Sequence, residues 1–236
     1  MKSESLPITG KKLVQLLNDR DLDSLRIRAE NLETLEKIDA IIIVGSSFTG
    51  KSTLVDAVRN AITQDPQALG HLSVPKKIIT RPQRENDNLL ENDFRSPAEF
   101  ATMVQNGEVG LHWVRKMEGT RTENYGFLPP KPGTIPVYSA NNAIVNNRES
   151  VNPKDLLEKS LLIAVYAPED IRKHRLFDRS PDLVAQKSEE VTYRLADKAV
   201  NMFPESPIVV KNFGRYQSQT ESDVVLLMKS LIQGVI

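Results

Sequence analysis

The residues best suited to chemistry form a glycine-bounded segment, Gly45-Ser46-Ser47-Phe48-Thr49-Gly50-Lys51-Ser52. It fits the pattern G-x-x-x-x-G-K-[ST] in full, between an apolar run and a helix-like stretch. Backbone N–H groups of such a turn point inward as an anion nest, and the following helix adds the positive end of its dipole. We expect Lys51 to reach the β- and γ-phosphates of a nucleotide and Ser52 to offer its hydroxyl to Mg²⁺. Together with Thr53, the segment is predicted to bind a nucleoside triphosphate.

A second candidate site lies in Thr80-Arg81-Pro82-Gln83-Arg84. Pro82 biases Arg81 toward extended backbone, and the planar guanidinium group suits bidentate contacts to phosphate. The two arginines could therefore seat the phosphate of an acceptor molecule. Two surface arginines near a proline are more often simply solvated, and that alternative stays open.

Composition excludes several other kinds of chemistry. The 236 residues carry 31 Lys and Arg against 31 Asp and Glu, so there is no basic field for nucleic acid or an anionic membrane. The absence of cysteine excludes disulfide frameworks, thiolate nucleophiles and cysteine-based zinc sites. The longest apolar runs, 40–44 and 224–228, are far shorter than the ~18 residues of a membrane span, and the N-terminus lacks a secretory apolar core. We expect a cytoplasmic protein that binds neither nucleic acid nor membranes.

The elements that must position the candidate residues alternate along the chain. Strands are predicted at 40–44, 76–80, 111–117, 134–138, 161–166 and 208–210, and helices at 51–63, 97–106, 168–177, 188–202 and 220–232. The stretch 118–136, rich in glycine and proline, is predicted to be an irregular loop. Strands that alternate with helices indicate βαβ units, so the predicted fold is α/β with a mostly parallel sheet flanked by helices.

The N-terminal residues 1–38 are predicted to form a helical extension. Leucines and an alanine recur every three or four positions over 11–38, which is typical of amphipathic helices. We favour a helix pair packed on the main domain, 39–236, over an arm that binds a partner or a second copy of the chain.

Several short segments also carry a family resemblance. They are the glycine-bounded loop, Thr80–Arg84, Glu91–Phe100, Asn106-Gly107-Glu108, Leu111-His112-Trp113 and Asn124-Tyr125-Gly126. Their order resembles that of guanylate kinases, and the likeness to ribose 1,5-bisphosphate phosphokinases is closer still. The resemblance spans about 39–232 and implies a P-loop kinase core that uses ATP and Mg²⁺. It also implies an acceptor-binding insertion at about 78–130 and a lid at about 172–195.

The resemblance assigns roles to individual residues on the acceptor side. Arg81 and Arg84 match the acceptor-phosphate arginines, and Tyr125 matches the tyrosine before a glycine. Asp87 and Asn92 fall where guanylate kinases have a glutamate and a phosphate-binding tyrosine, and Asn92 is shared with the ribose-bisphosphate relatives. His112 replaces the glutamate that reads guanine in guanylate kinases, which argues against guanine as the acceptor's base. Its neighbour Trp113 is predicted to be a core or wall aromatic.

The lid and the nucleotide side are assigned in the same way. Arg179 and Arg194 best match the family's lid arginines and would neutralise the transferring phosphoryl group. Arg172 and Arg175 belong to the same cluster, and for Arg175 catalysis and an ordinary charged helix face are equally open. Asn212 resembles part of the adenine-side loop.

One expected acidic neighbour of the metal is missing. Where the family offers an acidic residue or an asparagine near the metal, 139–142 holds no acidic side chain.

The sequence therefore predicts a kinase that moves the γ-phosphoryl group of Mg·ATP onto the phosphate of a small phosphorylated metabolite. The resemblance favours ribose 1,5-bisphosphate as that acceptor. A kinase for a nucleoside monophosphate such as GMP is the alternative within the same class. A catalytically silent guanylate-kinase-like interaction module is the alternative outside it, and the intact pair Lys51 and Ser52 argues against silence.

Overall fold

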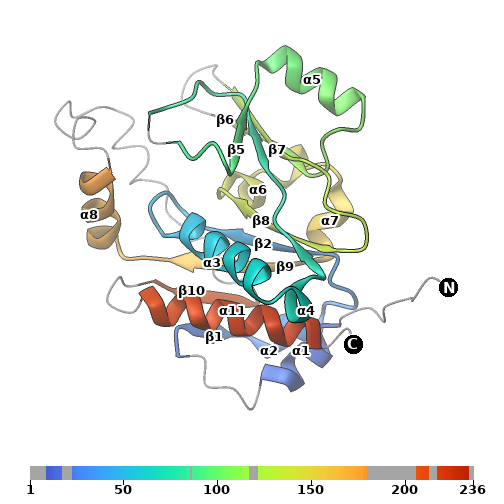
Figure 1. Ribbon diagram of the computed structural model, residues 1–236, viewed down its shortest axis with the longest axis vertical. Helices are drawn as coiled ribbons and strands as arrows, with labels where there is room; N and C mark the ends of the chain where they lie inside the picture. Colours follow the sequence, from blue (N-terminus) through green and yellow to red (C-terminus); the bar gives the residue numbers. More distant parts are fainter. Residues whose placement is uncertain are drawn as a thin grey trace.

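Two β-sheets form the framework of the protein (Figure 1). The computed structural model describes residues 9–17, 23–85, 87–116, 122–179, 206–212 and 217–233. The strands are β1 (Leu25–Ile27), β2 (Ala40–Val44), β3 (Leu72–Ser73), β4 (Lys77–Ile79), β5 (Asn92–Phe94), β6 (His112–Lys116), β7 (Thr122–Phe127), β8 (Ile135–Ala140), β9 (Ser160–Tyr166) and β10 (Ile208–Lys211). The helices are α1 (Gly10–Leu17), α2 (Ala29–Glu33), α3 (Lys51–Gln64), α4 (Pro66–Leu69), α5 (Pro97–Gln105), α6 (Ala143–Asn146), α7 (Lys154–Glu158), α8 (Glu169–Arg179) and α11 (Gln217–Gln233), with a 3₁₀ turn at Arg148–Ser150.

The larger sheet has six strands in the order β1-β10-β9-β2-β8-β3. All neighbouring strands in it are parallel except β1 and β10, which are antiparallel. The predicted α/β class with a mostly parallel sheet is therefore confirmed. Because parallel strands share one direction, the carboxyl ends of β2, β8, β9 and β10 lie at the same edge, where α/β proteins commonly bind their ligands.

Both faces of the larger sheet are covered, and β2 shows how its sequence achieves this. All five residues of β2 are buried, as expected for a central parallel strand. Ile41 and Ile43 pack on the face covered by α1, α2, α3, α4 and α11. Ala40, Ile42 and Val44 pack on the opposite face, against α6 and the aromatic side chains of the smaller sheet. The strand thus contributes to two cores, which holds the loop that follows it in a fixed place.

The smaller sheet has four strands in the order β5-β4-β7-β6 and lies within the predicted acceptor-binding insertion. Its strands β4 and β5 are parallel, whereas β7 is antiparallel to both β4 and β6. Helix α5 flanks this sheet and begins with a capping box, in which Ser96 and Glu99 each accept a hydrogen bond from the other's backbone N–H. The buried rings of Trp113, Tyr125 and Phe127 join this sheet to the larger one.

Two predicted segments need correction. The helices expected over 11–38 form as α1 and α2 and pack on the main core, but β1 lies between them, because Leu25 and Ile27 pair with Val210 and Ile208 of the larger sheet. The predicted loop at 118–136 contains β7, in which Gly126 pairs with both β4 and β6. A Cβ at Gly126 would lie 2.7 Å from a methyl group of Val109, so glycine serves close packing within a strand here, not a turn.

Part of the predicted lid and the helix predicted at 188–202 lie outside the described residues. Among the described helices, none combines the length and the apolar character needed to cross a bilayer.

Candidate functional site

The glycine-bounded loop joins the carboxyl end of β2 to the first turn of α3, as predicted. Both of its glycines are required by their surroundings. A Cβ at Gly45 would lie 2.6 Å from the carbonyl oxygen of Val165 on β9. Gly50 has φ +96° and a Cβ there would lie 2.3 Å from an amide nitrogen of Asn212. Phe48 also has a positive φ, 64°, which is uncommon for a bulky residue and is a form of strain found at functional loops.

Side chains from outside the loop hold its backbone in this conformation. Three consecutive carbonyl oxygens each accept a hydrogen bond: Ser47 from Arg172 Nε (3.0 Å), Phe48 from Arg175 Nη1 (3.1 Å) and Thr49 from Asn212 Nδ2 (2.9 Å). Arg175 Nη2 also donates to Asn212 Oδ1 at 3.0 Å, so these two donors are linked to each other. Because C=O and N–H point in opposite directions across a peptide plane, carbonyls held outward turn the N–H groups that follow them inward. Arg172, Arg175 and Asn212, which we call the loop clamp, therefore preform the anion nest.

Further contacts act within the loop and beneath it. Lys51 Nζ donates to the carbonyl oxygen of Ser46 at 2.6 Å, and Thr49 Oγ1 donates to the same oxygen at 3.0 Å. Asn142, which follows β8, donates from Nδ2 to Ser46 Oγ at 3.1 Å. Lys51 is thereby held across the mouth of the loop, where a lysine can reach a phosphate.

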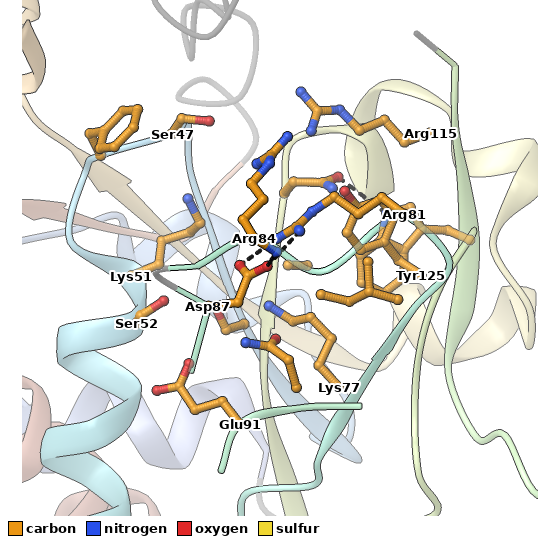
Figure 2. Close-up of a pocket in the computed structure, with 17 residues that line it drawn as sticks. Ser47, Lys51, Ser52, Lys77, Arg81, Arg84, Asp87, Glu91, Arg115 and Tyr125 are labelled. Atoms are coloured by element: carbon orange, nitrogen blue, oxygen red, sulfur yellow. Dashed lines mark hydrogen bonds and ion pairs between the residues drawn. The ribbon is translucent and has the colours of Figure 1, made fainter. Parts of the chain in front are cut away.

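The loop opens into a cavity of about 270 Å³ between the two sheets (Figure 2). On the loop side it is lined by Ser47, Phe48, Lys51 and Ser52. On the side of the smaller sheet it is lined by Lys77, Arg81, Arg84, Asp87, Glu91, Asn92, Trp113, Arg115 and Tyr125. Ile79 of β4 and the residues at the end of β8, Ser139, Ala140 and Asn141, complete the lining. The structure thus brings the predicted phosphate loop and most of the predicted acceptor residues to one space.

Arg81 is engaged by a carboxylate from its own loop. Its Nη1 and Nη2 donate to Asp87 Oδ2 and Oδ1 at 2.6 and 2.7 Å, and Asp87 Oδ2 also accepts the backbone N–H of Arg84 at 2.7 Å. Burial by itself lowers the pKa of Arg81, but the hydrogen bonds and charge of Asp87 outweigh it and raise the pKa. Burial by itself would raise the pKa of Asp87. Its contacts with Arg81 and Arg84 outweigh burial, so the pKa of Asp87 is lowered. The pair is ionised and fixes Arg81 in place, while Asp87 offsets its charge.

A second group of charges lies at the start of β4 and β5. Burial raises the pKa of Glu91 to about 7, and the neighbouring carboxyl group of Asp56 on α3 adds to the effect. Two carboxylates near each other repel, so the proton on one of them is held more tightly, which explains the direction of this shift. Burial lowers the pKa of Lys77 to about 8, with the charge of Glu91 opposing the change and that of Arg81 adding to it. At neutral pH the cavity therefore holds a protonated lysine beside a carboxyl group that titrates.

The far wall of the cavity is aromatic. Trp113 is fully buried, stacks on Tyr125 with ring centroids 5.6 Å apart, and donates from Nε1 to Asn141 Oδ1 at 3.1 Å. The prediction that Trp113 is a core or wall aromatic is confirmed. Burial, the charge of Glu123 and the 2.7 Å hydrogen bond that Tyr125 donates to it all raise the pKa of Tyr125. A neutral phenol beside Arg115 gives this wall a polar edge.

Other predicted residues lie elsewhere. His112 is half-buried and faces away from the residues that line the cavity, with its ring edge against Phe100 at 6.2 Å, and burial lowers its pKa. Thr53 is also outside the cavity lining. Asn212 is buried with both amide atoms bonded to protein groups, so it touches the loop from behind. Arg194 and the side chain of Arg179 lie outside the described residues.

Three charged residues of the lining were not predicted: Lys77, Glu91 and Arg115. Strand periodicity carried a signal for two of them. Side chains two residues apart share one face of a strand, so Lys77 must share a face with Ile79 and Arg81, and Arg115 with Trp113. No such pattern marks Glu91, which precedes β5.

Comparisons with known proteins bear on this site. No protein-family model matches the chain. It is similar to the ribose 1,5-bisphosphate phosphokinase of Brucella melitensis, with 28% identity over 160 residues that cover 66% of this chain and 73% of the relative. It is also similar to the enzyme of the same name from Bradyrhizobium diazoefficiens, with 22% identity over 142 residues that cover 59% of this chain and 65% of the relative. The resemblance to ribose 1,5-bisphosphate phosphokinases that the motifs predicted is confirmed.

A comparison of structures gives a guanylate kinase from Anaplasma phagocytophilum, with a TM-score of 0.48 and 13% sequence identity. The match covers 81% of this chain and 85% of that protein.

Proposed function

We propose that this protein is an ATP-dependent kinase that transfers the γ-phosphoryl group to a phosphate of a small phosphorylated metabolite, with ribose 1,5-bisphosphate as the favoured acceptor. The observation that carries the proposal is the shared cavity, which Lys51 and Ser52 line from one side and Arg81, Arg84 and Lys77 from the other. A kinase of this type needs two anions brought together under positive charge. The names of the similar proteins support the same acceptor.

The chemistry requires positioning more than proton transfer. An acceptor phosphomonoester has a second pKa of about 6, so its oxygen is mostly ionised at neutral pH and needs no general base. The loop clamp turns backbone N–H groups toward the polyphosphate, and Lys51 adds a full positive charge at the transferring group. Arg84 and the fixed Arg81 would orient the attacking phosphate. Arg179 and Arg194 remain proposed sources of further charge from the lid.

The residues present fit a magnesium ion that is bound mainly through the nucleotide. Ser52 lines the cavity from the first turn of α3, where its hydroxyl could bind the ion. Among the described residues, no three histidine or acidic side chains come close enough together to hold a metal by themselves. This is the usual arrangement for Mg²⁺, which keeps several waters and binds one or two protein oxygens plus the phosphates. The ion would neutralise charge on the phosphates, and Ser52 would orient it.

The two alternatives have weaker support. For GMP, the residue at the position of the guanine-reading glutamate, His112, does not line the cavity. A silent interaction module would have no use for a preformed anion nest in which Lys51 is already held across the loop.

An acceptor screen tests the proposal. ATP consumption, coupled to ADP detection, is measured with ribose 1,5-bisphosphate, GMP, dGMP and AMP. We expect turnover with the sugar bisphosphate, and a loss of kcat of at least ~100-fold in Lys51→Ala, because that variant removes a charge aimed at the transferring group. Lys37→Ala is the matched control, since Lys37 is exposed and precedes the opposite, amino end of β2. ATP binding without turnover on any phosphorylated acceptor would contradict a kinase and favour the interaction module.

A further inference from the structure

Lys77 is a cation of the cavity that has no hydrogen bond or ion pair with the described residues. It is the first residue of β4, and its side chain lines the cavity with those of Ile79 and Arg81. Its ammonium nitrogen lies 5.6 Å from the centroid of the Phe127 ring. In the part of the chain that the structure describes, no hydrogen bond or ion pair engages this ammonium group. Figure 2 shows the side chain reaching toward the pair formed by Arg81 and Asp87.

Such a cation is unfavourable for the fold by itself. Removing an ammonium group from water costs free energy unless a partner replaces the lost hydration, and a ring face 5.6 Å away replaces only part of it. The lowering of the Lys77 pKa to about 8 expresses that cost, yet at pH 7 the side chain is still mostly protonated. A residue that costs stability and lines a cleft is a candidate for ligand binding.

The neighbours of Lys77 indicate what kind of ligand would engage it. Arg81 is matched by Asp87, so its charge is offset before any ligand arrives. Lys77 lacks such a carboxylate, and Glu91, its acidic neighbour, is partly protonated near neutral pH. An anion that enters this part of the cavity therefore meets positive charge at Lys77. The carboxyl group of Glu91 and the amide of Asn92, which also line the cavity, can bond to hydroxyl groups.

The reacting phosphate and this anion would occupy different places. The reacting phosphate must approach the loop that carries Lys51, whereas Lys77 comes from the smaller sheet. In the view of Figure 2, Arg81 and Asp87 lie between the two lysines. An acceptor that engages both sides must therefore carry a second anionic group.

We propose that Lys77 binds the anionic group of the acceptor that does not react, and so selects a sugar that carries two phosphates over an acceptor with one. This inference rests on the proposed kinase function and adds the residue that determines its specificity. Lys77 acts by direct contact with the acceptor, while ATP binds on the other side of the cavity.

The test compares Lys77→Met with Lys76→Met, the adjacent lysine, which does not line this cavity. Steady-state kinetics are measured with ribose 1,5-bisphosphate and with ribose 1-phosphate, which lacks the second phosphate. We expect the KM for the bisphosphate to rise about 10- to 100-fold in Lys77→Met, as for loss of a charged hydrogen bond, with the KM for ATP unchanged. The preference for the bisphosphate should collapse, Lys76→Met should behave as the wild type, and Lys77→Arg should recover part of the loss.

A stability measurement separates binding from structure. Because Lys77 is unpaired, Lys77→Met should raise Tm by a few degrees, which a residue retained for the fold would not do. An unchanged KM and an unchanged preference in Lys77→Met, with wild-type turnover intact, would overturn this inference alone. A lowered Tm or a variant that does not fold would also overturn it. A wild-type protein that phosphorylates no acceptor would instead overturn the proposed function.

Discussion

Replacement of Asn212 by alanine tests whether the loop clamp preforms the nucleotide site. Asn212 is buried behind the loop, donates to the carbonyl of Thr49 and accepts from Arg175. Asn212→Ala removes both bonds and leaves the Thr49 carbonyl and an arginine N–H without these partners. We expect the loop to sample other conformations and to bind phosphates more weakly.

The size of the effect follows from the two bonds. A neutral buried hydrogen bond contributes about 1 kcal/mol net, and one to a charged group about 1.5–3 kcal/mol. The loss is therefore about 2.5–4 kcal/mol, shared between stability and binding. If about half of it appears in binding, the Kd for ATP rises roughly 10-fold, since 1.4 kcal/mol corresponds to a factor of ten. Isothermal titration of ATP and, separately, of inorganic tripolyphosphate would measure it.

The two titrations distinguish two roles for Asn212. If Asn212 holds the loop, ATP and tripolyphosphate lose affinity by the same factor. If it contacts the adenine base, only ATP loses affinity. Asn212→Asp is the companion variant, because it keeps an acceptor for Arg175 and loses the donor to Thr49. Unchanged affinity for both ligands in a folded Asn212→Ala protein would refute the reasoning.

Two further predictions concern stability. The pKa of Glu91 is raised to about 7, so the folded protein holds a proton more tightly than the unfolded chain, and its stability falls as pH rises from about 4.5 to 7. Glu91→Gln should therefore raise the free energy of unfolding by about 1–3 kcal/mol at pH 8 and change it little at pH 4. Urea denaturation at both pH values measures this difference. An equal effect at both pH values would contradict a carboxyl group that titrates. Ser96→Ala removes the cap of α5 and should lower Tm by a few degrees without altering kcat. Thermal melts and steady-state kinetics measure the two quantities. An unchanged Tm would mean that the capping box adds nothing to the stability of the fold.

The elements predicted well from the sequence are those whose signals are local. The loop from Gly45 to Ser52, the apolar run before it and the helix after it each follow from neighbouring residues. The helix start at Ser96 has its cap, proline and glutamate within four residues. The backbone conformation of a loop or a helix start depends on residues close together in the chain, so a single sequence is enough to predict it.

The elements that were missed depend on partners far away in the chain. Strand β1 exists because Leu25 pairs with Val210, and nothing near Leu25 marks that pairing. Strand β7 lies between two strands of the smaller sheet, and a glycine such as Gly126 indicates a turn when only its sequence neighbours are considered. Glu91 was missed for the same reason: it lies near Asp56 because the smaller sheet packs near α3, and its sequence neighbours do not show this. The loop clamp was missed as well, because Asn212 and Thr49, which it joins, are 163 residues apart in the chain.

The most direct measurement of the central claim is a ³¹P NMR spectrum of the protein incubated with Mg·ATP and ribose 1,5-bisphosphate. A nucleotide phosphate held at Lys51 and an acceptor phosphate held at Arg84 in one cavity predict a new diphosphate product and ADP in equal amounts, with neither formed by Lys51→Ala. Product formed equally well by Lys51→Ala, or ATP that stays intact with every phosphorylated acceptor, would contradict the account.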